Sequence, residues 1–163
     1  MRGSLALSLT TALLAAGSAP AHPAIAAFNT WCFKAGQTEA EARANMRPEA
    51  QGFTLTFWDD SLAPRPAGSP DGVERRCRVS FPGDHADAAI DALRRQMATP
   101  PVFGTPIPLP ATHHATEATA LIEGRELLRG RVAVVEVGTL PGPATYLSVD
   151  RLYAGLGLPP EAD

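Results

Sequence analysis

Arg131-Val132-Ala133-Val134-Val135-Glu136-Val137 is the stretch that decides the fold class of this chain. Valine is β-branched and favours strands, and a run with so few polar side chains belongs in the middle of a sheet. The stretch therefore predicts a central strand. Pro141-Gly142-Pro143 follows as a turn, and Thr145–Val149 is expected to pair back as the final strand.

Two alternating runs predict a second pair of strands. Phe53–Trp58 alternates large apolar residues with Thr, which is typical of a strand buried on one face. Val73–Phe81 alternates in the same way. One predicted face holds Val73, Arg75, Cys77, Val79 and Phe81, and the other holds Glu74, Arg76, Arg78 and Ser80. We expect an antiparallel pair with a long connection, because residues 59–72 are rich in Pro and Gly.

Two helices are predicted from capping signals and apolar spacing. Thr38 and Glu41 match a capping box, so a helix should start at Thr38 and end near Met46, two residues before Pro48. Asp84 is the expected cap of a second helix. One apolar stripe marks that helix, formed by Ala86, Ile90, Leu93 and Met97.

Three segments are harder to assign. Residues 99–114 contain five prolines and are expected to be a Pro-rich loop, extended over the sheet. Residues 116–129 fit either a strand or a helix, and we favour a strand because the segment leads into the valine-rich run. Residues 153–163 are predicted to be a loose tail. The expected fold is α+β, with a five-stranded antiparallel sheet, two helices on one face and the order α-β-β-α-β-β-β.

The N-terminal segment has the order of a secretory signal peptide. Met1 and Arg2 carry the positive charge, and the apolar run Leu5–Ala16 is too short to span a bilayer. Small residues then offer two cleavage sites, after Ala21, which we favour, or after Ala26.

Residues 1–21 are therefore predicted to be removed, leaving residues 22–163 as a single secreted α+β domain. We expect a periplasmic or secreted protein without a membrane span. No lipid anchor is expected either, because Ser18 stands where a lipidated chain would need Cys.

Composition and missing motifs exclude several classes of function. The chain has 163 residues, a net charge of −3 and a pI near 5.8, which argues against a nucleic-acid binder. No G-x-S-x-G, H-E-x-x-H, C-x-x-C or Gly-rich phosphate loop is present. We therefore expect no enzyme activity and no nucleotide cofactor.

Cys32 and Cys77 are expected to form a disulfide, because an exported chain with two cysteines meets an oxidising compartment. A redox or metal-binding thiol pair is the alternative, but such pairs usually have closer spacing.

Arg76 and Arg78 form the first candidate site. They share the outward face of the Val73–Phe81 strand, and two guanidinium groups could bind an anionic ligand or partner through bidentate hydrogen bonds. The alternative is a solvated strand whose charges prevent aggregation.

His22 carries a second candidate site. After cleavage at Ala21 its amine and imidazole could both bind copper, with His113, His114 or His85 as a further ligand. This arrangement resembles the histidine brace of secreted copper proteins. Against it, His22-Pro23-Ala24 is expected to begin a flexible tail, and adjacent His113 and His114 point to opposite sides of an extended chain.

Asp59 and Asp60 form a third candidate site, as the paired carboxylates of a hydrolase. The alternative is that two acidic residues at the end of a strand simply indicate a turn. The sequence as a whole favours a non-catalytic binding or interaction module of the cell envelope, with an unknown protein or small-molecule partner. A periplasmic copper-binding protein is the alternative, and a hydrolase comes third.

Overall fold

The computed structural model describes residues 21–99, 103–127 and 130–153. The predicted signal segment, apart from Ala21, and residues 154–163 of the predicted tail lie outside these ranges.

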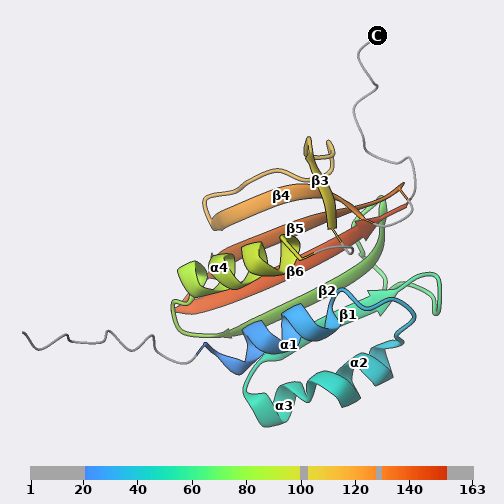
Figure 1. Cartoon of the computed structure of the whole chain (residues 1–163). Coiled ribbons are helices and arrows are strands. Elements are labelled where there is room, and N and C mark those ends of the chain that lie inside the picture. The colour runs from blue at the N-terminus through green and yellow to red at the C-terminus, as the bar shows by residue number, and fades with distance from the viewer. Residues whose placement is uncertain (1–20, 100–102, 128–129, 154–163) are drawn as a thin grey trace, which may run out of the picture.

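One antiparallel sheet organises the chain (Figure 1). Its strands are β1 (Thr54–Asp59), β2 (Val73–Pro82), β3 (Phe103–Ile107), β4 (Thr119–Leu127), β5 (Arg131–Leu140) and β6 (Ala144–Leu152). Their order across the sheet is β1-β2-β6-β5-β4-β3, so β2 and β6, far apart in sequence, lie side by side. The α+β class, the antiparallel β1–β2 pair and the strand assignment for β4 are confirmed.

The predicted count of five strands is wrong, because part of the Pro-rich loop forms β3. In the described part of the chain this strand lies at the edge of the sheet and pairs with β4 alone. Pro106 cannot donate a backbone hydrogen bond, and an edge strand tolerates that loss because one of its sides has no neighbour. Prolines thus exclude residues 99–114 from the middle of the sheet, as predicted, but they do not exclude residues 103–107 from its edge.

The helices are α1 (Pro23–Trp31), α2 (Glu39–Met46) and α4 (Ala86–Met97), with a single helical turn, α3 (Pro48–Gln51). The capping box of α2 is confirmed: Glu41 N–H donates to Thr38 Oγ1 and Thr38 N–H donates to Glu41 Oε2. His85, not Asp84, occupies the N-cap position of α4.

The predicted count of two helices and the predicted flexible tail at His22 are both wrong, because a further helix, α1, begins one residue after His22. Pro23 stands in the first turn, where its fixed φ suits a helix and its missing N–H has no partner to lose. Ala24, Ile25 and Phe28 on α1 are at most 1 % exposed. This apolar stripe packs against β2, α2 and α4, so it anchors the start of the domain in the core.

The sheet has two unlike faces. α1 and α4 cover one of them, which we call the helix face, and most of the core lies there (Figure 1). The opposite side, the open face, has a smaller apolar cluster. Its buried members are Trp58, Val73, Val132, Val134 and Leu152, and Ile107 and Leu109 pack against them.

The disulfide between Cys32 and Cys77 is confirmed, with the two Cα atoms 5.4 Å apart. It joins the end of α1 to β2 on the helix face. Gln37 supports the same loop, because its Nε2 donates to Trp31 O at 2.9 Å and to Lys34 O at 3.2 Å. Closing a loop over a separation of 45 residues stabilises the fold by about 4 kcal/mol through the entropy of the unfolded chain.

A bulge at the start of β2 corrects the predicted faces of this strand. The register with β6 shifts between Val73 and Arg75, so two residues of β2 lie opposite Arg151. As a result Val73 joins the cluster of the open face, whereas Glu74 accepts a hydrogen bond from Arg151 Nε at 2.8 Å. From Arg75 to Phe81 the predicted alternation holds.

Gly124 on β4 is the position where β3 approaches most closely. A Cβ at this residue would lie 2.9 Å from Ile107 O and 3.0 Å from Pro108 O, which are both backbone atoms. We therefore expect Gly124→Ala to weaken the docking of β3 and to lower the free energy of unfolding by about 2 kcal/mol, measured by urea denaturation. Ala120→Ser, at an exposed position of β4, is the control and should change it by less than about 0.5 kcal/mol. Equal stability of the two variants would contradict this account of β3.

Candidate functional site

The open face contains a buried ion cluster centred on Asp150. Arg76 from β2 donates from Nε to Asp150 Oδ1 at 2.7 Å and from Nη2 to Oδ2 at 2.5 Å. His113 lies in the arm between β3 and β4, and its Nε2 is 3.0 Å from the same Oδ2. Burial raises the pKa of the Asp150 carboxyl, but the hydrogen bonds from Arg76 and His113 outweigh it and lower the pKa below its ordinary value. The cluster ties the arm to the sheet.

Arg76 is therefore not the free cation that the sequence predicted. Its guanidinium is held in a bidentate pair with a carboxylate that is 5 % exposed. Asp150 itself was missed, because an acid within a mostly apolar strand gives no sign of its partner until β2 and β6 are known to be neighbours.

Arg78 differs from Arg76 although it is only two residues away. Its guanidinium lies 3.9 Å from the ring centroid of Tyr146, and it makes no ion pair within the part of the chain that the structure describes. Thr56 and Ser148 are its partners in register on β1 and β6. Arg78 is thus held in place by an aromatic ring without being neutralised by an acid.

Tyr146 supports Arg78 from a fixed position. Its hydroxyl donates to Glu136 Oε1 at 2.6 Å, and Thr119 Oγ1 donates to the same oxygen at 3.0 Å. Burial raises the pKa of Tyr146 to about 12, with a further contribution from Glu136, so the phenol stays protonated. No pattern in the sequence indicates this support, since Tyr146 and Glu136 become neighbours through the β5–β6 pairing.

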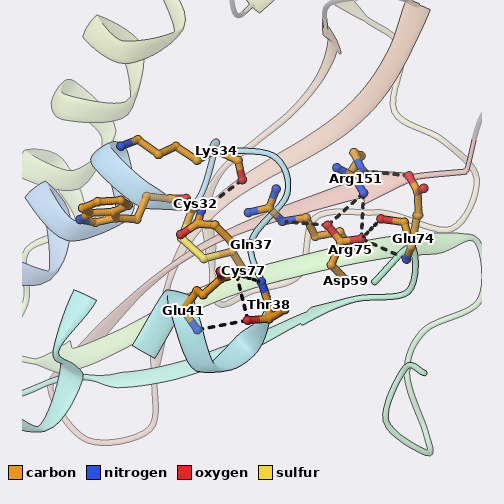
Figure 2. Close-up of polar contacts among 12 residues, drawn as sticks. Cys32, Lys34, Gln37, Thr38, Glu41, Asp59, Glu74, Arg75, Cys77 and Arg151 are labelled. Atoms are coloured by element: carbon orange, nitrogen blue, oxygen red, sulfur yellow. Dashed lines mark hydrogen bonds and ion pairs between the residues drawn. A yellow bond between two sulfur atoms is a disulfide. The ribbon is translucent and has the colours of Figure 1, made fainter. Parts of the chain in front are cut away.

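Asp59 and Asp60, the predicted carboxylate pair, do not share a site. Asp59 is buried on the helix face, where it accepts from Arg151 Nη2 at 3.0 Å and lies 3.8 Å from Arg75 Nε (Figure 2). It also accepts hydrogen bonds from the backbone and hydroxyl of Ser61, as expected of a turn. Asp60 instead accepts from the Tyr153 hydroxyl.

Arg75 completes the ion cluster on the helix face. Its guanidinium lies over the ring of Phe57, 4.9 Å from the centroid, and burial lowers its pKa to about 10 despite the opposing effect of Asp59. Asp59 is therefore engaged with two arginines, Arg75 and Arg151, in a buried ion cluster.

The predicted metal ligands separate into two groups. His113 lies on the open face with Asp150, and His114 is exposed. His22 lies instead beside His85, with ring centroids 5.6 Å apart, and stacks on Phe81 at 4.4 Å. Burial and the neighbouring His85 lower the pKa of His22.

Neither histidine group is a ready metal site by side chains alone. In residues 21–99, 103–127 and 130–153, no three His, Cys, Asp or Glu side chains come together in a way that could hold a metal ion. The ligand set of His22 with His113 or His114 is thus not assembled, and only the pairing of His22 with His85 remains.

The chain matches no protein-family model, and no curated protein or solved structure is detectably similar to it. Within the described ranges, no helix is long and apolar enough to cross a membrane.

Asp150→Asn tests the ion cluster of the open face. The substitution leaves Arg76 without its charged partner, so we expect the free energy of unfolding at pH 7 to fall by about 3 kcal/mol, measured by urea denaturation. Because the pKa of Asp150 is lowered in the folded state, its contribution is complete above the ordinary value of 3.8 and is lost as the pH falls through the folded value. The difference in the free energy of unfolding between Asp150→Asn and the unchanged protein should therefore shrink in acid.

Asp91→Asn, at an exposed position of α4, is the control and should lower the free energy of unfolding by less than about 0.5 kcal/mol. A similar loss in both variants would contradict the role of Asp150.

Proposed function

We propose that this protein is an exported, non-catalytic binding module of the cell envelope that holds a carboxylate of its partner on the open face of the sheet, at Arg78. The observation that carries the proposal is the contrast between two neighbouring arginines. Arg76 is neutralised by Asp150, whereas Arg78 rests on Tyr146 with no acid in ion-pair distance among the described residues.

The surroundings of Arg78 suit a carboxylate-bearing protein segment. A guanidinium held flat against a ring can offer two parallel N–H groups to a carboxylate, and little side-chain entropy is lost when its position is already fixed. Thr54 and Thr56 are exposed on the adjacent edge strand, where their hydroxyls could bond the main chain of the partner. Among the described residues no helix covers this surface (Figure 1), and the segment between β3 and β4 reaches the sheet at Asp150 rather than at Arg78.

The carboxylates on the two faces of the sheet are already engaged by neighbouring side chains. Asp59 and Asp150 are both engaged with arginines, and Glu136 accepts from Tyr146 and Thr119. These carboxylates support the fold and hold neighbouring side chains, so a hydrolase built on them has no free base.

Export is supported by the leader pattern, the disulfide and the position of α1. Cleavage after Ala26 would remove Ala24 and Ile25, which are fully buried in the core. Cleavage after Ala21 leaves α1 whole. We therefore favour a mature chain that begins at His22.

Intact mass spectrometry of the protein exported by its own host tests this start. We expect a mass that begins at His22 and is two hydrogens below that of the reduced chain, because Cys32 and Cys77 are joined. A mass beginning at Met1 or Ala27 would refute the proposed processing, and reduction followed by a second spectrum is the control for the disulfide.

Site-directed cross-linking tests the binding surface. A photoreactive residue in place of Thr56, beside Arg78, should capture a defined partner in cells, and Arg78→Gln should reduce the adduct about tenfold, because a charge-assisted hydrogen bond contributes roughly 1.5 kcal/mol or more. Arg94→Gln, at an exposed position of α4, is the matched control and should leave the adduct unchanged. An adduct that survives Arg78→Gln would overturn the assignment of this surface.

A further inference from the structure

We propose that the processed protein binds one copper(II) ion between His22 and His85, with the α-amino group of His22 as a third nitrogen ligand. The inference rests on the proposed processing after Ala21, since only a free terminus supplies the amine. It does not depend on the partner surface at Arg78.

The structure holds His22 in place, as a ligand must be held. Its carbonyl accepts from Ile25 N–H at 3.0 Å, and its Nδ1 accepts from Ala24 N–H at 3.2 Å, so the residue is the N-cap of α1. Ala24 and Ile25, two and three residues after it, are fully buried. Its ring stacks on Phe81 at 4.4 Å between centroids. The expected weakness of a mobile terminus therefore does not apply.

His85, the second proposed side-chain ligand, is also held in place by its neighbours. Its backbone N–H donates to Thr145 Oγ1 at 2.8 Å, and that hydroxyl donates to Gly83 O at 2.8 Å. The imidazole lies against Gly83, where even a Cβ would come within 2.5 Å of Nε2. Phe81 is its third neighbour, with ring centroids 5.6 Å apart. The loop after β2 therefore positions the second imidazole.

The spacing of the two rings fits a shared ion. A metal–nitrogen bond of about 2 Å and a ring centre about 1.1 Å behind each nitrogen place two imidazoles on one ion with centroids about 4.4 to 6.2 Å apart, from adjacent to opposite positions. The observed separation of His22 and His85 is 5.6 Å. The two imidazoles thus lie within the range of separations that one ion allows.

Processing after Ala21 would turn the backbone nitrogen of His22 into a metal ligand. Before processing, the His22 nitrogen is an amide and is not a ligand; afterwards it is an amine that can chelate together with Nδ1 of the same residue. Pro23 has no N–H, so the next main-chain nitrogen cannot be deprotonated to join the chelate. A further nitrogen donor must come from elsewhere in the fold, and His85 supplies it.

Copper(II) is the ion that suits this set best. Neutral nitrogen donors favour copper over the other divalent first-row metals, and three of them leave positions open for water or a ligand. Chelation through Nδ1 also replaces the hydrogen bond from Ala24 N–H, so loading exchanges the cap of α1 for a metal bond.

Copper(II) titration of the exported and processed protein tests the site, followed by calorimetry and by electron paramagnetic resonance of the bound ion. We expect one equivalent bound, with coupling to three nitrogens. One added alanine before His22 should weaken binding at least tenfold without disturbing the fold, and His85→Asn should do the same and reduce the coupled nitrogens to two. His114→Asn, at an exposed histidine outside the site, is the matched control and should change neither readout.

Two results would overturn the inference. Unchanged affinity and spectrum in the extended chain would exclude the amine, and unchanged values in His85→Asn would exclude the second imidazole. Failure of copper binding in a chain whose mass begins at His22 would refute this site and leave the export proposal intact, whereas a different mature start would refute the processing on which this site rests.

Discussion

The pairing of β2 with β6 holds the two parts of the sheet together. It joins the β1–β2 pair to the β4–β5–β6 part of the sheet, across about half of the described chain. Three polar contacts cross this junction: Arg76 meets Asp150, Arg78 meets Tyr146, and Glu74 meets Arg151. The two faces of the sheet differ, because α1 and α4 bury the helix face, whereas the open face is not covered by a helix of the described chain (Figure 1).

The sequence predicted those parts of the fold that depend on residues close together in the chain. The capping box at Thr38 and Glu41 fixes the start of α2 by two hydrogen bonds within four residues, and the alternation of β1 and most of β2 follows from burial of one face. The disulfide was also predictable, since two cysteines allow only one pairing. These features need no knowledge of distant neighbours.

The features that sequence reasoning missed are set by tertiary neighbours. α1 is short, and what stabilises it is packing of Ile25 and Phe28 into the core rather than helix propensity. β3 exists because Gly124 leaves room for its backbone. At the candidate sites, Arg76 and Arg78 look equivalent in sequence, and only the position of Asp150 on the next strand separates them. His85, previously one of three possible partners of His22, is singled out by its place after β2.

The two edges of the sheet set the way in which another molecule can be recognised. At one edge, α2 packs beside β1, and Arg43 Nη2 donates to Leu55 O at 3.2 Å, which occupies a main-chain acceptor that an incoming strand would need. At the other, β3 is short and carries Pro106, which has no donor to offer. Both edges are poor templates for β-augmentation. Copies of this chain are thereby hindered from polymerising edge to edge at high concentration, and recognition is left to side chains on the face rather than to main-chain hydrogen bonds.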